Sequence, residues 1–236
     1  MTFKEDLIAA RDAIVASDFE VRDGQVVPQT KDVGYNQAVK LHASYLYADM
    51  VDSSGLVGIS PKETVGKVFR LFLDLSVRII RERGGHIRSF DGDRIMGIFI
   101  GDRRFDASVK SAMQIKWACD NIIQPEITRR YKSIREADWK IKPGSGIASG
   151  PAFIVRGGVR QSSSDLVSIG PPPNLAAKLS DKREDPYHLR IGEHTYKNLT
   201  DAGRMSKAVN MWQGPYPMTL GGKSYKYYRS SYYWSL

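Results

Sequence analysis

The strongest constraint on the fold of this 236-residue chain is a predicted β-hairpin near its middle. Residues 86–90 and 93–100 both have strand composition, and Asp91-Gly92 stands between them. An Asp-Gly pair tolerates the left-handed backbone of a tight hairpin turn, so it is a strong short-range hairpin signal. The second run is apolar on both faces, which predicts a central strand. The chain should therefore build a mostly antiparallel sheet around this hairpin.

Helical patterns interleave with further strands along the chain. Residues 61–83 carry apolar residues at helical spacing, with Ser60 expected to cap the start and Gly84-Gly85 to end the helix. Shorter helices are predicted over 3–17, 106–123, 174–179 and 192–199. Further strands are predicted as two in 139–158 around a tight turn, one in 166–169, one in 187–191 and two in 205–233. The predicted fold class is α/β, an α+β sandwich whose central sheet is flanked by helices.

The length and composition indicate an ordinary globular protein. Apolar residues make up 42% of the chain, and no apolar run of 18 residues is present to span a membrane. The charged N-terminus does not resemble a signal peptide. Cys119 is the single cysteine, so no internal disulfide forms, and we predict a buried thiol in a cytoplasmic protein. Residues 1–40 are interpreted as an N-terminal helical extension, and 41–236 as one catalytic domain.

The formal charge of +9 suggests an anionic partner such as a nucleotide, a nucleic acid or an anionic lipid. The basic residues are dispersed, in pairs such as Arg103-Arg104, Arg129-Arg130 and Lys182-Arg183. No long basic tract or nucleic-acid-binding motif is present, and we predict neither a nucleic acid nor a membrane as partner.

Residues 43–55 predict a binding site for a metal-bound polyphosphate. A buried strand is expected to end at Asp49 and to break into a turn at Ser53-Ser54-Gly55. A carboxylate at a strand end supplies the oxygen ligands that Mg²⁺ prefers, and free backbone amides after it suit phosphate oxygens. The alternative is a structural acidic residue at a sheet edge.

Asp93 is the predicted partner of Asp49. It lies 44 residues later, again at a strand boundary, and a strand–helix–hairpin arrangement brings the two positions side by side. Two adjacent carboxylates repel unless cations lie between them, as in a two-metal site for phosphoryl or nucleotidyl transfer. Asp52 and Asp91 are competing candidates, although Asp91 is better explained as a turn residue.

Five ordered motifs resemble the class III nucleotidyl cyclases over roughly residues 41–230. They are Tyr47-Ala-Asp-Met-Val51, Asp91-Gly-Asp-Arg-Ile-Met-Gly-Ile-Phe99, Pro143-Gly-Ser-Gly-Ile-Ala-Ser-Gly-Pro151, Ser168-Ile-Gly170 with Asn174-Leu-Ala-Ala-Lys178, and Gly221-Gly222-Lys223. Each motif is weak alone, and their order makes the resemblance specific. It implies the cyclase fold, with a ferredoxin-like, mostly antiparallel central sheet.

The resemblance also implies a site and a reaction. Asp49 and Asp93 would hold two divalent cations, Mn²⁺ or Mg²⁺, with the backbone carbonyl of Met50 as a further ligand. The backbone amides near Asp52, Ser53 and Ser54 would hold the β- and γ-phosphates of a nucleoside triphosphate. The 3′-hydroxyl would attack the α-phosphate, leaving a 3′,5′-cyclic nucleotide and pyrophosphate.

Other family residues map onto the second half of the chain. Asn174 would orient the ribose, Lys178 would stabilise charge on the α-phosphate, and Lys223 would contact the triphosphate. In the family the first two come from the second chain of a head-to-tail dimer, so the resemblance implies a homodimer with composite active sites. Without the resemblance, Asn174 is explained as a helix N-cap after the prolines, and both lysines as surface residues.

Three positions depart from the best-known members of the family. The transition-state arginine is Lys178 here, which keeps the charge but loses the planar fork, unless Arg94 or Arg156 replaces it. The two base-reading positions hold Ser89 and Val167, which match neither purine code. A smaller, less demanding base edge is similar to that of the bacterial pyrimidine cyclases of Pycsar antiphage systems.

The sequence thus predicts a pyrimidine nucleotidyl cyclase, with UTP favoured over CTP, that signals in antiphage defence. An adenylate cyclase with an unusual base pocket is one alternative. The other is a cyclase-like domain that binds nucleotide without turnover, since Lys178 weakens the catalytic signature.

Overall fold

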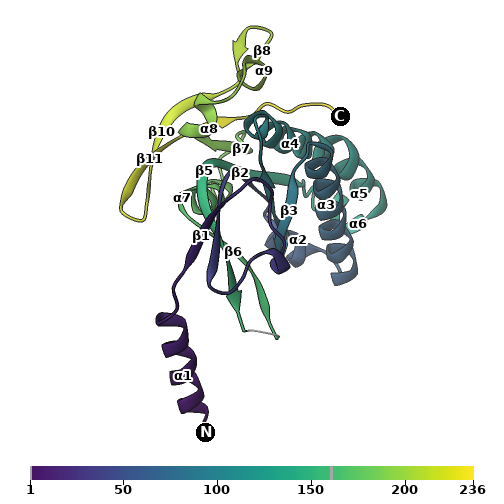
Figure 1. The fold of residues 1–236 in the computed structure, drawn as a ribbon. Helices are drawn as coiled ribbons and strands as arrows, with labels where there is room; N and C mark the ends of the chain where they lie inside the picture. The colour runs from purple at the N-terminus through teal and green to yellow at the C-terminus, as the bar shows by residue number, and fades with distance from the viewer. Residues whose placement is uncertain (1, 160–161) are drawn as a thin grey trace. The chain divides into compact units, whose positions relative to one another are not determined.

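The computed structural model describes residues 2–159 and 162–236. Two compact units make up the chain: Met1–Leu41 with Ala152–Ile169, and His42–Pro151 with Gly170–Leu236. Two long strands, β2 (Gln37–Val51) and β5 (Lys142–Gly158), run through both units (Figure 1). The larger unit contains every residue that lines the candidate pocket described below.

A mixed, mostly antiparallel sheet forms the centre of the larger unit. Its strands lie in the order β10-β11-β7-β5-β2-β4-β3. The strands are β3 (His86–Asp91), β4 (Arg94–Phe99), β7 (Leu189–Gly192), β10 (Gln213–Leu220) and β11 (Lys223–Ser230), with β2 and β5. The pairs β10–β11, β11–β7, β2–β4 and β3–β4 are antiparallel, and β5 runs parallel to β7. The predicted hairpin is confirmed as β3–β4, with Gly92 at φ 60° in its turn.

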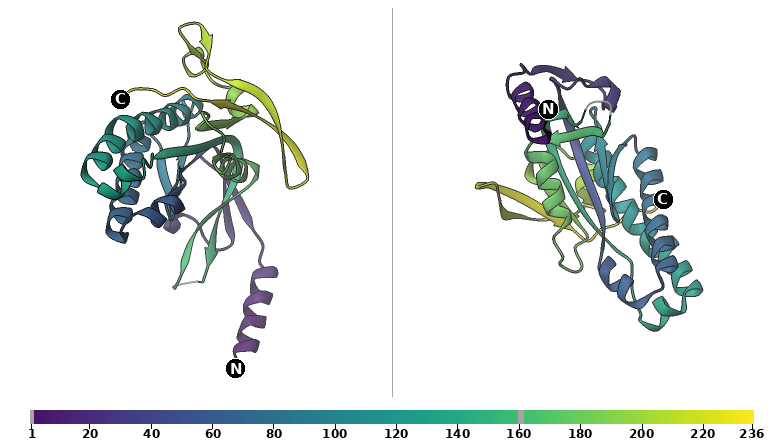
Figure 2. Two further views of the ribbon diagram at one scale, coloured as in Figure 1. Left: turned by 180° about the vertical axis from the view of Figure 1, so that it is seen from behind. Right: turned by 90° about the horizontal axis from the view of Figure 1, so that it is seen from below.

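Helices cover both faces of this sheet (Figure 2). On one face lie α3 (Lys62–Glu82), α4 (Arg104–Ala118), the π-helix η2 (Cys119–Ile123), α5 (Gln124–Arg130) and α6 (Lys132–Glu136). Leu46, Ala48 and Met50 alternate along β2 and join the core beneath them. On the opposite face lies α7 (Pro171–Ser180). The residue between Ala48 and Met50 therefore points to the α7 side, and that residue is Asp49.

Short elements complete the larger unit. They are α2 (Ser53–Ile59), α8 (Glu193–Lys197), α9 (Asp201–Arg204), β8 (Met205–Ser206) and β9 (Val209–Asn210). Cys119 is buried as predicted. No helix in the described part of the chain has the length and apolarity needed to cross a bilayer.

The smaller unit combines the N-terminus with the end of β5. Helix α1 (Phe3–Val15) begins with a capping box between Thr2 and Glu5, and none of its residues is buried. Strand β1 (Glu20–Gly24) runs parallel to the first part of β2, and β6 (Ser164–Ile169) runs antiparallel to the last part of β5. The 3₁₀ turn η1 (Thr30–Asp32) lies between β1 and β2.

Several sequence-based boundaries are wrong. Residues 139–158 do not form two strands around a turn, because their glycines lie within the single strand β5. Strand β2 continues past Asp49 to Val51, and the predicted turn residues Ser53–Gly55 begin α2 instead. Ser60 does not cap α3; its hydroxyl bonds Ser133 Oγ at 2.8 Å.

Candidate active site

The end of β2 and the turn of the β3–β4 hairpin enclose a polar pocket of about 400 Å³. Six predicted site residues come together in its wall: Asp49, Met50, Asp52, Ser53, Ser54 and Asp93. Asp91, Arg94 and Arg183 complete the lining. The alternation of β2 and the turn of the hairpin thus bring the two aspartates of the sequence motif into one cavity.

The chain turns sharply at Asp52 on leaving β2. This residue has φ 60° and ψ 35°, a left-handed conformation that aspartate tolerates better than most residues. Its carbonyl accepts a bond from Trp139 Nε1 at 3.3 Å, and its carboxylate lies where a Cβ on Gly55 would be. Ser53 and Ser54 are thereby held at the pocket wall at the start of α2.

One carboxylate oxygen of Asp93 is buried and, among the described residues, unpaired. This oxygen is Oδ2, which has no hydrogen-bond partner in the part of the chain that the structure describes. Burial raises the pKa of Asp93, and the negative charge of Asp49 raises it further, while polar groups of Ser53 and Met50 oppose this in part. An ionised carboxylate at this place needs a positive charge that the neighbouring side chains do not supply to it.

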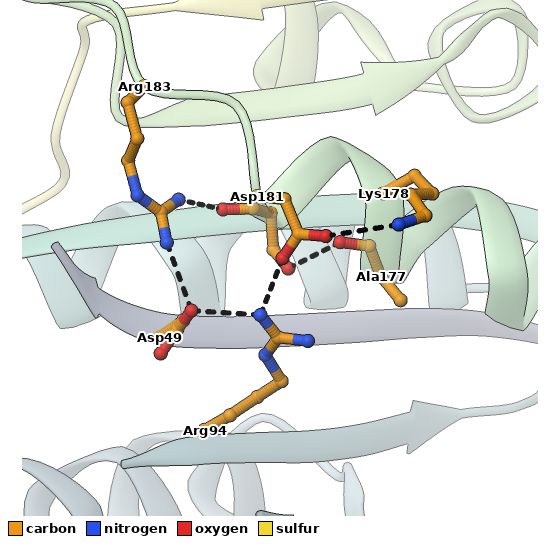
Figure 3. Close-up of polar contacts among 7 residues, drawn as sticks. Asp49, Arg94, Ala177, Lys178, Asp181 and Arg183 are labelled. Carbon is orange, nitrogen blue, oxygen red and sulfur yellow. Dashed lines mark hydrogen bonds and ion pairs between the residues drawn. The ribbon is translucent and has the colours of Figure 1, made fainter.

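Asp49 forms ion pairs with two arginines. It is only 8% exposed, and its Oδ2 accepts bonds from Arg94 Nη2 and Arg183 Nη2, both at 3.0 Å (Figure 3). Arg94 also bonds Asp181 Oδ1 at 2.5 Å, and Asp181 Oδ2 lies 3.7 Å from Lys178 Nζ. An ion-pair chain thus connects the end of α7 to the pocket, with guanidinium groups against the carboxylate.

The donor set of the pocket fits divalent cations. The described residues contain no group of three or more His, Cys, Asp or Glu side chains poised around one metal position. Magnesium, however, is commonly held by one or two carboxylates, with water and substrate phosphate completing its shell. The unpartnered Oδ2 of Asp93 beside a second carboxylate matches that arrangement.

The remaining predicted residues lie outside this pocket. Asn174 and Lys178 are exposed and one turn apart on α7, on the same helix face. The N-cap explanation of Asn174 is wrong, because α7 begins at Pro171 after its N-cap Gly170. Lys223 is exposed at the start of β11, where the Gly221-Gly222 turn joins it to β10.

The two positions to which the resemblance assigns base recognition lie in different units. Ser89 on β3 is half-buried, and its Oγ lies 3.8 Å from Met96 Sδ. Val167 on β6 is 48% exposed and pairs with Val155 of β5.

Arg183 is a residue that sequence reasoning missed. In the sequence, Arg183 is recognisable only as part of the basic pair Lys182-Arg183. Nothing in the local pattern indicates that the loop after α7 places it next to Asp49. Of the two arginines considered as substitutes for the transition-state arginine, Arg94 lines the pocket. Arg156 stacks over Tyr35 at 4.5 Å and bonds Ser164 Oγ within the smaller unit.

Sequence comparison with known proteins identifies the family of this chain. No family model matches it. A uridylate cyclase of Rhodovulum sp. (strain MB263) is 36% identical over 97% of this chain and 94% of its own length. A uridylate cyclase of Xanthomonas perforans is 31% identical over the whole of both chains. The chain belongs to the uridylate cyclase family. A third member, from Burkholderia cepacia, is 32% identical over 82% of this chain and 83% of its own length.

Solved structures show that this uridylate cyclase family member has the class III cyclase fold. An adenylyl cyclase of Pseudomonas aeruginosa superposes with a TM-score of 0.66 at 18% identity, covering 82% of this chain and 95% of that one. The guanylyl cyclase Cya2 superposes with a TM-score of 0.64 at 15% identity, covering 82% and 93%. The predicted fold class and the nucleotidyl cyclase assignment are confirmed.

Proposed function

We propose that this chain converts UTP to 3′,5′-cyclic UMP and pyrophosphate. The observation that carries the proposal is the convergence of Asp49 and Asp93 in one polar pocket, in a chain 31–36% identical to three proteins named uridylate cyclase. Neither observation is sufficient alone. The pocket supports cyclase chemistry, and the relatives support the pyrimidine base.

Asp49 and Asp93 would hold two divalent cations, Mn²⁺ or Mg²⁺, with the Met50 carbonyl as a further ligand. Such cations, when bound, lower the pKa of a ribose hydroxyl and neutralise negative charge on phosphate. The unpartnered Oδ2 of Asp93 supports this role for the chain's own carboxylates. Arg94 and Arg183, which contact Asp49 and line the same pocket, would lie near the incoming phosphates.

The chain's other residues would bind and orient the substrate. Asp52, Ser53 and Ser54 line the same pocket. Their backbone amides would hold the β- and γ-phosphates, and Lys223 would add a positive charge. In the reaction the 3′-oxygen bonds to the α-phosphorus and loses its proton, while the bond from that phosphorus to the pyrophosphate oxygen breaks. Orientation of the hydroxyl along this line accounts for much of such a rate enhancement.

A second copy of the chain would complete each site. Asn174 and Lys178 project from one exposed face of α7 and are absent from the lining of the pocket in their own chain. In a homodimer with composite sites, Asn174 of one subunit would orient the ribose held by the other. Lys178 would stabilise charge on the α-phosphate, as a point charge rather than a two-point fork.

The base would be selected by a small and weakly polar edge. Among the residues that the structure describes, the hydroxyl of Ser89 has a thioether as its hydrogen-bond partner, and the Val167 side chain has no polar group. A site selects a purine when its buried donor and acceptor would be left unpaired by a smaller base. A site without such a pair does not reject a pyrimidine. The relatives' name favours UTP over CTP.

One assay tests the function. The purified chain is incubated with Mn²⁺ and each of ATP, GTP, CTP and UTP, and the products are identified by mass spectrometry. We expect cyclic UMP as the main product. Cyclic AMP as the main product would establish an adenylate cyclase instead, and nucleotide binding with no product from any triphosphate would establish a binding domain without turnover.

We propose that this activity serves signalling in antiphage defence. We also propose a cytoplasmic location, where the single buried thiol of Cys119 would stay reduced. The resemblance to the pyrimidine cyclases of Pycsar systems supports it. Phage should form fewer plaques on bacteria that carry the active cyclase than on the same bacteria carrying an inactive cyclase, and equal plaque numbers would contradict the role.

A further inference from the structure

A second pocket, of about 550 Å³, lies beside the catalytic pocket and shares only Arg183 with it. The loop from α7 to β7, the start of β5, the end of the α4–η2 segment and the C-terminal tail surround it. Its wall is rich in basic side chains: Lys116, Lys142, Lys182, Arg183, His188 and Arg190. Its volume is within the usual range of small-molecule sites.

Arg190 is the unusual member of this wall. The residue is only 1% exposed, although arginine is almost never fully buried without a partner. Its Nε and Nη1 have no hydrogen-bond partner in the described residues, and its Nη2 reaches only the Glu184 carbonyl, at 3.5 Å. Burying a charge without a counter-charge costs free energy, so an anion bound next to this guanidinium would stabilise the fold.

The carboxylates of the pocket do not supply that anion. Each of the three is engaged by another basic side chain: Asp120 by Lys116, Asp185 by Lys142 at 2.7 Å, and Glu184 by Arg229. Among the described residues, Lys182 and Arg190 form no ion pair with a carboxylate. The pocket therefore holds an excess of positive charge, part of it shielded from water.

We propose that this pocket binds the phosphate group of a small molecule, with Arg190 as its buried counter-charge. Guanidinium groups form strong, directional hydrogen bonds with phosphate oxygens, and lysine ammonium groups add point charges at the rim. The rings of Tyr187 and Tyr233 also line the pocket, which leaves room for more than a bare anion. The free ion and a nucleoside monophosphate are the two sources to be compared.

Binding is measured by isothermal titration calorimetry and by thermal unfolding, with a chelator present so that no divalent cation occupies the catalytic pocket. The probes are inorganic phosphate and uridine 5′-monophosphate, and potassium chloride of equal ionic strength is the reference. We expect saturable binding and a rise in Tm with phosphate beyond that with chloride. Tighter binding of the nucleotide would identify the source as a nucleotide, and equal binding would identify free phosphate.

Arg190→Gln should weaken phosphate binding by about tenfold or more, because a charge-assisted hydrogen bond is lost. Lys132→Gln, at an exposed lysine on α6 outside the pocket, should bind as the parent chain does. If Arg190→Gln does not fold, Lys182→Gln on the loop gives the second test and should also bind more weakly.

Two results would overturn the proposal: no saturable binding by the parent chain, or unchanged binding in these pocket variants. Asp93→Asn, which removes a predicted metal ligand, should keep its phosphate response. Failure of the cyclase assay and failure of this inference are therefore distinguishable.

Discussion

At the scale of single residues, Asp93 is the sharpest test of the site. Asp93→Asn should reduce cyclic nucleotide formation by about 10²-fold or more, because a neutral amide cannot replace the carboxylate that is proposed to hold a cation and offset its charge. In chelator at neutral pH the variant should unfold at the same or a slightly higher temperature. The pKa of Asp93 is raised in the fold, so its ionised form opposes folding above the ordinary aspartate pKa.

The matched control is Asp91→Asn. Asp91 also lines the pocket and is exposed, and asparagine suits the same hairpin turn. It should keep most of the activity. Product measured by chromatography and Tm measured by fluorimetry decide the comparison, and full activity in Asp93→Asn would remove that residue from the site.

His188 should make the fold sensitive to acid. Burial lowers its pKa to about 3, and the nearby charges of Lys116 and Arg190 act in the same direction. The unfolded chain takes up a proton near pH 6.5 while the folded chain does not. The free energy of unfolding therefore falls as pH drops from about 6.5 towards 3, by at most about 1.4 kcal/mol per pH unit from this residue.

The measurement is urea unfolding between pH 7 and pH 4.5 in phosphate-free buffers. His188→Gln should show a shallower loss of stability over that interval than the parent chain. His86→Gln, at an exposed histidine on β3, should follow the parent curve. Parallel curves for the parent chain and His188→Gln would show that His188 is not held neutral.

The predicted site residues that the structure brings into one pocket are those at or next to a strand end. Asp49 and Asp93 sit at such ends, and strand pairing brings strand ends together. Arg183 and Arg190 could not be found in this way. Arg183 depends on the path of an irregular loop, and Arg190 looks like an ordinary exposed strand arginine until the burial of β7 is known.

At the scale of elements, α7 packs so closely on β5 that a glycine is required between them. A Cβ on Gly146 would lie 2.1 Å from the Ala176 carbonyl oxygen and 2.3 Å from the Ser180 nitrogen, both backbone atoms. Gly146→Ala should therefore push α7 from the sheet and destabilise the fold by about 1–3 kcal/mol. Activity should fall as well, because α7 carries Asn174 and Lys178.

Gly66→Ala is the control for that substitution. Gly66 lies within α3, and a Cβ there would meet nothing within 4 Å. Alanine should stabilise this helix by up to about 1 kcal/mol. Urea unfolding of the two variants gives the comparison, and equal stability of Gly146→Ala and the parent chain would mean that α7 accommodates the methyl group.

The same contact explains why β5 was predicted wrongly. Glycines in 139–158 indicate turns by local rules, yet Gly146 is there to admit a helix backbone, which is a tertiary reason. Strand β1 was missed because four of its five residues are exposed and show no alternation. By contrast, α3 and the β3–β4 hairpin were predictable, since their periodicity and turn chemistry are local.

At the scale of the whole molecule, the proposed composite site predicts complementation between two inactive chains. In a mixed dimer of Asp93→Asn with Lys178→Met, one site contains both substitutions and the other contains neither. With random mixing, half of the dimers are mixed and each has one intact site. An unfractionated mixture should therefore regain about a quarter of the parent activity, and purified mixed dimers about half, measured per active site.

Each variant alone serves as the control for this experiment. Lys178→Met alone should lose about tenfold or more of its turnover, because the charge on the α-phosphate is no longer offset. The two chains are co-expressed with different tags and purified by both, so that mixed dimers are assayed directly. Recovery shows that Asp93 and Lys178 act on one substrate from different subunits. If the doubly tagged dimers are as inactive as each single variant, Asp93 and Lys178 act on the substrate from the same chain. The ion-pair chain from Lys178 through Asp181 and Arg94 to Asp49 would then be the route by which α7 reaches the site.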